Sequence, residues 1–477
     1  MRGRRALAGA FAALAAGLAA RGALAAPQAA QAARPEQSLA AALRLETISH
    51  EDPAQFRGEP FLALHRMLEA AYPQAHARLA REVVADYSLL YTWRGSDPKL
   101  APMLLTAHLD VVPVTPEALP DWDHPPFAGE IADGFVWGRG AIDDKGSLIA
   151  LFEAVEQLVA SGFAPRRTIY LAFGHDEEVG GGRGAAAISE LLRSRDVKLW
   201  LSLDEGLAVI SDTGGIVGSA ALIGVAEKGF LTLELTAREP GGHSSTPPPE
   251  TAIGRLARAI QRLEENPLPA RIDGVAAQMF DALAPQLPFE RRLAIRNRGW
   301  LAPLLEWALA RDPATNALIR TTTAVTMVRG GVKENVLPQS ATATVNFRLL
   351  PGDSVDEVIA HVREVLGDDA IEIAKRTADE ASDVAPTDGA QFAALKGALA
   401  EVDPSLPVAP ALVLGGTDTK WYGRLSDASY RFVPFHFDSS DLRRAHGTDE
   451  RLSLDNLRWG VRFYGALIRH AAGEGAK

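Results

Sequence analysis

The sequence predicts an α/β fold, in which helices cover a sheet, with a second α+β unit inserted into it. Short apolar runs typical of buried strands alternate with stretches in which apolar residues recur at helical spacing, which predicts the α/β part. From about residue 227 to about residue 376 the chain carries strands and helices of its own, which predicts the inserted unit. The 477 residues also exceed the roughly 250 to 300 at which a single core stops growing, so two domains are expected.

The larger unit is expected to comprise residues 38–226 and 377–477. Its predicted strands are residues 101–107, 168–173, 198–203 and 408–414. Between the first two strands, apolar residues of the segment 148–159 fall on one helical face, and Gly162 ends that helix. Ligands bind at the carboxyl ends of strands in such sheets, so the residues that follow each strand are candidates for a site.

The inserted unit, residues 227–376, contains predicted strands at 230–237 and 341–349 and a predicted helix at 251–263. Alternate residues of the second strand are apolar, as in a strand with one buried face. The apolar, proline-interrupted stretch 267–313 contains helical pieces that the sequence does not place. It could wall an apolar pocket for an acyl chain or pad the inserted unit.

The N-terminus predicts an export signal. A basic start is followed by an Ala/Leu run at residues 6–20 and a small-residue site at Ala23-Leu24-Ala25, so residues 1–25 are the expected signal peptide and 26–37 a linker. The alternative is a retained anchor, but the run is shorter than the roughly 20 apolar residues that span a bilayer. The expected product is a secreted or periplasmic protein without a stable membrane span.

Charge and composition exclude several classes of function. The formal net charge of −11, without a long Lys/Arg run, argues against a nucleic-acid partner. The chain has no cysteine, which excludes disulfides, thiolate metal sites and a cysteine nucleophile. Any metal must therefore be held by histidines and carboxylates.

Three short motifs carry candidate chemistry. His108 and Asp110 follow the first strand and share one face of an extended chain, so Asp110 could hold one ring nitrogen while the other binds a metal. Asp143 and Asp144 are adjacent in a glycine-rich loop, an arrangement that is costly without a cation. An incidental His-x-Asp pair and a solvated, helix-capping turn are the competing interpretations.

The third motif, residues 175–182, follows the second strand and contains Asp176, Glu177 and Glu178 in succession. One of these carboxylates could bind a metal while its neighbour acts as a general base, and an exposed acidic loop is the alternative. The pair Asp204-Glu205 and the late His446 are weaker signals of the same kind.

The order His108, Asp143, Glu177-Glu178, Asp204 and His446 resembles the zinc-dependent family of aminoacylases, glutamate carboxypeptidase and succinyl-diaminopimelate desuccinylase. The runs 137–146, 175–182 and 415–419 are most similar to its branch of Gly-Xaa carboxypeptidase S and secreted N-acyl-amino-acid hydrolases. The resemblance covers nearly the whole chain after the signal. It implies a zinc-peptidase-like catalytic domain with a central mixed sheet and an inserted ferredoxin-like lid through which the protein forms a homodimer.

The resemblance also implies roles for these residues. Two Zn²⁺ ions, replaceable in vitro by Co²⁺ or Mn²⁺, would be bridged by Asp143. Glu178 and His446 would complete one site, and His108 and Asp204 the other. Glu177 would be the general base and Asp110 would orient His108, while the peptide between Asp143 and Asp144 would be cis.

Further residues resemble the family's substrate-binding groups. His243, in the segment 241–245, is similar to a lid histidine that reaches the partner subunit's active site and stabilises the oxyanion. Asn335 and Arg348 resemble residues that grip the substrate's carboxylate or carbonyl. Gly415, Gly416 and Thr417 could present backbone N–H groups to that carboxylate. Ordinary turn and strand polarity is the competing interpretation for all of them.

The sequence thus predicts hydrolysis of the amide bond before an amino acid with a free α-carboxylate, released from a peptide or an N-acyl chain. A deacylase of small acetyl or succinyl amino acids and a non-catalytic ligand-binding relative are the alternatives.

Overall fold

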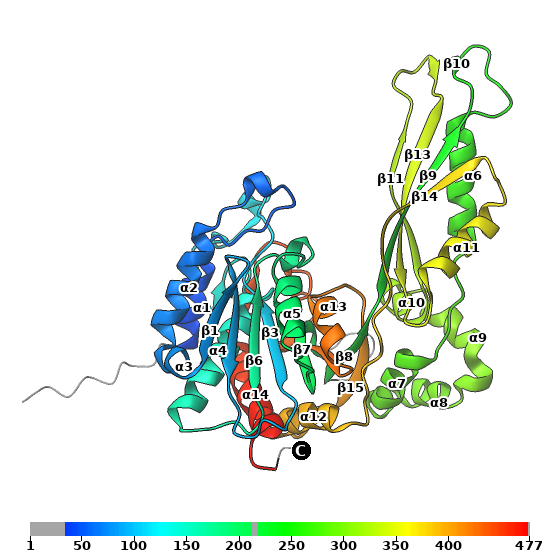
Figure 1. Ribbon diagram of the computed structural model, residues 1–477. Helices are drawn as coiled ribbons and strands as arrows, with labels where there is room; N and C mark the ends of the chain where they lie inside the picture. The colour runs from blue at the N-terminus through cyan, green and yellow to red at the C-terminus, as the bar shows by residue number, and fades with distance from the viewer. Residues whose placement is uncertain (1–33, 212–217, 476–477) are drawn as a thin grey trace, which may run out of the picture.

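The computed structural model describes residues 34–211 and 218–475 (Figure 1). The predicted signal peptide and most of the predicted linker lie outside the described residues. Helix α1 (Pro35–Leu43) begins within the predicted linker, whose bounds stay a prediction. Among the described residues, no helix is long and apolar enough to cross a membrane.

The larger unit is built on one eight-stranded mixed sheet with the order β1-β2-β6-β3-β7-β16-β8-β15. The strands are β1 (Ala80–Val84), β2 (Ser88–Trp93), β3 (Met103–His108), β6 (Ile169–Gly174), β7 (Leu201–Ser211), β8 (Ser219–Glu227), β15 (Val408–Val413) and β16 (Ser429–Phe437). The central strands β6, β3, β7 and β16 are parallel, whereas β1, β2 and the β7–β8 pair are antiparallel. The central parallel strands bring several strand ends to one edge of the sheet, which positions the site.

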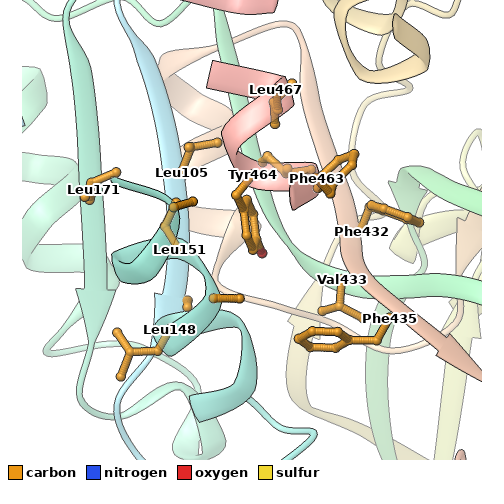
Figure 2. Close-up of a cluster of buried hydrophobic side chains, with 14 of the residues drawn as sticks. Leu105, Leu148, Leu151, Leu171, Phe432, Val433, Phe435, Phe463, Tyr464 and Leu467 are labelled. Atoms are coloured by element: carbon orange, nitrogen blue, oxygen red, sulfur yellow. The ribbon is translucent and has the colours of Figure 1, made fainter. Parts of the chain in front are cut away.

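Helices cover both faces of this sheet, which explains why its strands are continuous apolar runs. One face carries α1, α2 (Glu59–Ala71), α3 (Pro73–Arg78), α4 (Lys145–Ala160), α12 (Ala390–Val402) and α14 (Leu454–Ala472), and the other carries α5 (Ala185–Ser194) and α13 (Thr419–Tyr422). In Figure 2, Leu105 and Leu171 of the sheet face Leu148 and Leu151 of α4, with Tyr464 of α14 beside them. The adjacent Leu104 points to the opposite face and packs in the α5 cluster.

Most of the predicted elements of this unit are present. The strand at 101–107 is β3, the strand at 168–173 is β6, and the helix at 148–159 lies inside α4. The strand predicted at 198–203 begins only at Leu201. A small sheet of β4 (Glu130–Ala132), β5 (Phe135–Trp137) and β17 (Arg451–Ser453) completes the unit.

The inserted unit is an antiparallel sheet with the order β11-β13-β9-β14 and the chain order βαββαβ, which is the predicted ferredoxin-like topology. Its elements are β9 (Gly229–Arg238), α6 (Ala252–Glu265), β11 (Thr322–Gly330), β13 (Ser340–Leu349), α11 (Val355–Leu366) and β14 (Ile371–Asp379). In β13 every second side chain is buried, as the alternation predicts. The sheet begins at Gly229 and ends at Asp379. The division at 227 and 376 stays a prediction.

This inserted unit, the lid, stands away from the larger unit (Figure 1). The short pair β10 (Gly242–His243) and β12 (Val336–Leu337) lies at its far end.

The segment 267–313 that the sequence did not place contains α7 (Gly274–Leu283), α8 (Phe289–Arg296) and α9 (Arg298–Leu309), and α10 (Pro313–Ile319) follows. Helix α7 returns to the larger unit, where Met279 and Phe280 pack against Ala409 and Ala411 of the edge strand β15. It therefore packs on the main sheet at its β15 side, and the two interpretations of the segment stay predictions.

Candidate metal centre

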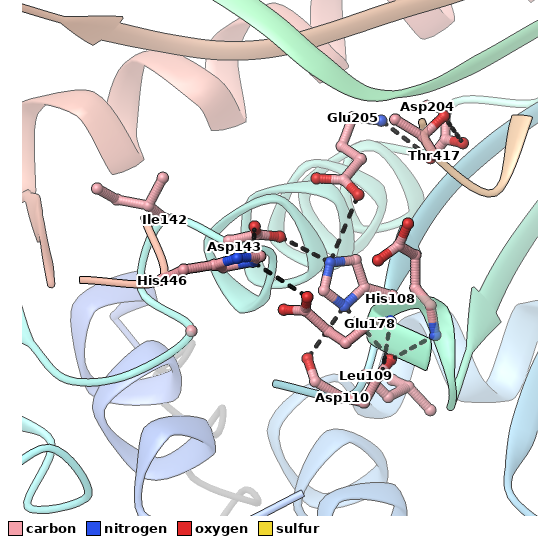
Figure 3. Close-up of polar contacts among 12 residues, drawn as sticks. His108, Leu109, Asp110, Ile142, Asp143, Glu178, Asp204, Glu205, Thr417 and His446 are labelled. Atoms are coloured by element: carbon pink, nitrogen blue, oxygen red, sulfur yellow. Dashed lines mark hydrogen bonds and ion pairs between the residues drawn. The ribbon is translucent and has the colours of Figure 1, made fainter. Parts of the chain in front are cut away.

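His108 is the last residue of β3 and is buried at the carboxyl edge of the main sheet. Its Nε2 atom lies 2.8 Å from Oδ1 of Asp143 (Figure 3). Its Nδ1 atom lies 3.0 Å from the backbone oxygen of Asp110 and 3.4 Å from Oδ1 of the same residue. Asp110 therefore holds Nδ1, as predicted, and leaves Nε2 directed into the site.

The carboxyl group of Asp110 also accepts hydrogen bonds from the backbone N–H groups of Glu177 and Glu178, each at 3.1 Å. These two residues begin the 3₁₀ turn η3 (Glu177–Val179), which directly follows β6. One buried carboxylate thus fixes the histidine of one strand end relative to the acids of the next.

Asp143 lies between two imidazoles. His446 Nε2 is 3.0 Å from Oδ2 of Asp143 and 3.0 Å from Oε2 of Glu178. Burial raises the pKa of Asp143, but the hydrogen bonds from His108 and His446 outweigh burial and hold this pKa below its ordinary value. Each oxygen of Asp143 therefore faces a different histidine.

Two overlapping groups of possible metal ligands result. One contains His108, Asp143 and Glu205, the other Asp143, Glu178 and His446, and in each group one ligand atom per residue lies within 4.8 Å of the others. Histidines from β3 and from the segment before β17 are thus brought together with acids from the loop before α4, from η3 and from β7.

One predicted ligand lies outside the cluster. Oε1 of Glu205 lies 3.6 Å from Nε2 of His108, whereas Asp204 is directed away and its Oδ2 accepts hydrogen bonds from the hydroxyls of Thr417 and Thr419. Figure 3 shows the two carboxyl groups pointing in different directions. Successive residues of a strand point to opposite faces, which separates the two side chains. The structure therefore brings Glu205, and not Asp204, next to His108, and the role of Asp204 as a ligand stays a prediction.

Glu450, four residues after His446, is a residue to which the sequence gave no role. Its carboxyl group is fully buried and accepts hydrogen bonds from the backbone N–H groups of Gly140, Ile142 and Asp143 at 2.8 to 3.1 Å. It thereby shapes the loop that presents Asp143. The peptide between Asp143 and Asp144 is cis, as predicted.

The donor set fits divalent cations. Burial raises the pKa of Glu177 and of Glu205 well above the ordinary range, and nearby acidic groups raise both further. Oε1 of Glu178 is buried and has no hydrogen-bond partner. Cations would neutralise this crowding of carboxylates and occupy the open oxygen. Imidazole and carboxylate ligands without thiolates are a set that Zn²⁺ accepts.

Comparison with known proteins agrees with this geometry. Residues 104–470 match the sequence model of peptidase family M20/M25/M40. The chain belongs to this family. It is accordingly a hydrolytic enzyme, as predicted, and its candidate ligand cluster fits a metallohydrolase.

Several relatives are similar over most of their length. The chain is 40% identical to a probable carboxypeptidase S-like 2 of Dictyostelium discoideum (91% of this chain, 84% of that protein). It is 40% identical to the human N-fatty-acyl-amino acid synthase/hydrolase PM20D1 (82% and 78%). An M20 family metallo-carboxypeptidase from Sulfolobus solfataricus shares the fold, with a TM-score of 0.65 at 19% identity (91% and 98%).

The M20 lid keeps two predicted substrate residues away from the centre of its own chain. His243 and Asn335 lie at the far end of the lid, and both are exposed (Figure 1). Nδ1 of His243 contacts the hydroxyl of Ser245, 2.8 Å away. Within one chain, the structure therefore does not bring these residues to the metal ligands.

Other predicted substrate residues of the M20 enzyme lie nearer the junction of its two units. Arg348 is the penultimate residue of β13, at the base of the lid, where its guanidinium lies over the ring of Phe230 at 4.7 Å from the ring centre. Gly415 and Gly416 follow β15, and a Cβ at either would meet open space. Thr417 is buried, and its hydroxyl donates to Glu227 at 2.5 Å, so its side chain has a structural role.

Proposed function

We propose that this chain is a two-zinc hydrolase that releases an amino acid with a free α-carboxylate from an N-acyl chain or a peptide. The observation that carries the proposal is the position of Asp143, whose two carboxylate oxygens face His108 and His446 separately. His108 and Glu205 would complete one zinc site, and Glu178 and His446 the other. When bound, such ions supply a nucleophilic water at neutral pH and offset negative charge that develops on the attacked carbonyl.

Glu177 is the proposed general base. Its backbone is fixed by Asp110, and burial raises the pKa of its carboxyl group, which suits a group that must take a proton and return it near neutral pH. Glu177 would take a proton from the attacking water and give it to the leaving amine. No covalent intermediate with the chain is required.

Arg348 is the proposed partner of the substrate's α-carboxylate. Its side chain is half-buried, and among the described residues no acid forms an ion pair with it. A guanidinium in this situation is suited to a bidentate carboxylate. The relatives named as carboxypeptidase S and N-fatty-acyl-amino acid hydrolase support an amino acid as the leaving group. Asn335 and the backbone of Gly415, Gly416 and Thr417 are proposed to contact the same end of the substrate.

A homodimer through the lid would complete the site. We propose that His243 of one subunit reaches the metal centre of the other, where it would stabilise the oxyanion. The edge strand β11 supports an interface on the lid, since it has an unpaired side and exposes Met327 and Val328.

The enzyme is further proposed to act outside the cytoplasm, on the strength of the signal pattern in residues 1–25. N-terminal sequencing of protein recovered from the periplasm or medium tests this, because processing near Ala25 is the expected result.

The function is tested with the purified protein, its metal content and Glu177→Gln. Wild type should contain two zinc ions per chain. It should hydrolyse N-acyl amino acids with a long or a short acyl chain, or dipeptides. It should not hydrolyse the same compounds when a carboxamide replaces the α-carboxylate. Glu177→Gln should keep the metal and lose activity by about 10² to 10⁴-fold. Full activity of the metal-loaded variant would contradict the mechanism, and equal hydrolysis of the carboxamides would contradict the substrate assignment.

A further inference from the structure

Helices α8 and α9, joined at Asn297, form a helix pair at the outer side of the molecule, beside the base of the lid (Figure 1). Five large apolar side chains on this α8–α9 pair are more than half exposed: Phe289 64%, Leu293 51%, Trp300 76%, Leu304 59% and Trp307 55%. Exposed apolar residues gathered in this way usually mark an interaction surface.

The exposed residues follow the helical repeat. Trp300, Leu304 and Trp307 are spaced i, i+4 and i+7, so they share one face of α9, and Phe289 and Leu293 share a face of α8. Helix α9 buries none of its residues, although Arg298 and Glu306 are its only charged ones. In α8 only Ile295 is buried, in the cluster that α7 forms with β15. The α8–α9 pair is thus anchored on α7 through Ile295. Nothing in the described chain covers its exposed apolar side chains, which are called the apolar face below.

Positive charge surrounds this face. From residue 289 to residue 309 the two helices have two acids, Glu290 and Glu306, and four arginines, at 291, 292, 296 and 298. Arg298 pairs with Asp281 at 2.6 Å, but the other three form no ion pair with a described residue. Further along, the guanidinium of Arg311 lies 3.5 Å from the ring centre of Trp307. The α8–α9 pair therefore carries a net positive charge, although the formal net charge of the whole chain is −11.

We propose that the α8–α9 pair docks the enzyme on an anionic lipid bilayer. Tryptophan, phenylalanine and leucine would enter the headgroup region, and the arginines would bind lipid phosphates. A second copy of this chain fits the face less well, because a two-fold interface would bring its unpaired arginines against the same arginines of the partner. The inference does not depend on the proposed reaction, because none of the residues that carry it is a candidate metal ligand.

Vesicle flotation of the purified protein tests the proposal. Wild type should float with vesicles of phosphatidylcholine and phosphatidylglycerol and bind vesicles of phosphatidylcholine alone more weakly. Trp300→Ser/Trp307→Ser and Arg291→Glu/Arg296→Glu should each weaken binding to the anionic vesicles by about tenfold or more.

A matched control removes two exposed apolar side chains elsewhere. Val332 and Leu119 are 96% and 48% exposed, and Val332→Ser/Leu119→Ser should bind as wild type does. Hydrolysis of a water-soluble substrate should be unchanged in all three variants, which shows that they fold.

Three outcomes would overturn the proposal. They are wild-type protein that does not float, tryptophan variants that float as wild type does, and equal binding to both kinds of vesicle. Loss of a dimer in sedimentation of the tryptophan variant, without vesicle binding by wild type, would assign the face to a protein interface instead.

Discussion

Oε2 of Glu450 lies 2.5 Å from Nη1 of Arg139, and both side chains are buried. The same carboxyl group accepts hydrogen bonds from backbone N–H groups of the loop that ends at Asp143. Arg139 in turn donates to the backbone oxygen of Gly447, next to His446. This pair therefore joins the segment of one candidate ligand to the loop of another, across more than half of the sequence.

Glu450→Ala should destabilise the protein and weaken its hold on metal. The change leaves a buried guanidinium and three N–H groups without their acceptor, for which a loss of about 3 to 5 kcal/mol in the free energy of unfolding is expected. Urea unfolding and metal analysis of the purified protein measure both effects. Glu401→Ala is the matched control, because Glu401 pairs with Arg469 on the surface and should contribute less than about 1 kcal/mol. Equal losses in the two variants would contradict the role of Glu450.

Glu205 and Asp204 should differ in their effect on metal content. Glu205→Gln removes a charged ligand candidate beside His108, so it should lose one of two metal equivalents. Asp204→Asn changes a carboxyl group that contacts Thr417 and Thr419, so it should keep both metals while unfolding more easily. Metal analysis after dialysis distinguishes them. If Asp204→Asn lost the metal and Glu205→Gln kept it, the assignment would be reversed.

Periodicity explains which features the sequence predicted. The apolar run of β3, the helical face of α4 and the alternation in β13 each repeat over several residues, so many side chains report the same element. The order of acids and histidines along the chain then predicted which loops meet. A single strand position carries no such redundancy, which is why the sequence could not show that Glu205, and not Asp204, lies beside His108.

Long-range packing explains most of what the sequence could not predict. The apolar face of α7 fits any apolar partner equally well, and its return to the edge strand β15 is set by the tertiary structure. The role of Glu450 was hidden for the same reason, since the N–H groups that donate to its carboxyl group lie about 310 positions away in the chain. A signal was present, because a glutamate so close to a candidate metal ligand is worth testing as a support for the site.

Metal binding by the metal-free enzyme should release a proton from His446. Hydrogen bonds to Asp143 and then to Glu178 raise the pKa of His446 from 6.5 to about 10, so its imidazole is protonated at neutral pH. A raised pKa in the folded state means that the stabilisation by these contacts is complete below pH 6.5 and is lost as the pH approaches 10. Because the metal must displace this proton, zinc affinity should rise with pH up to about 10.

Isothermal titration calorimetry of zinc binding measures this, in buffers that differ in ionisation enthalpy. His446→Gln should release about one proton fewer per chain than wild type, and equal proton release by the two proteins would refute the assignment.

Lys228 should make the stability of the enzyme depend on pH. It lies where β8 passes into the first strand of the lid, and its Nζ atom donates to the backbone oxygens of Ala317 and Arg320 at 2.9 and 2.8 Å. Burial, with a smaller effect of the nearby Arg348, lowers its pKa from 10.5 to about 7. Between these two values the unfolded chain binds a proton that the folded chain does not, so the free energy of unfolding should rise with pH.

Relative to Lys228→Met, wild type should therefore gain up to about 1.4 kcal/mol per pH unit across this window. Urea unfolding of both proteins at several pH values from 7 to 10.5 measures the difference, whose window is set by the folded and ordinary pKa of Lys228. Taking the difference between the two proteins cancels the other titrating groups. If the difference in the free energy of unfolding between the two proteins stayed constant with pH, Lys228 would be charged in the folded enzyme. Its ammonium group, bound by two carbonyl oxygens, would then hold the base of the lid as a cation.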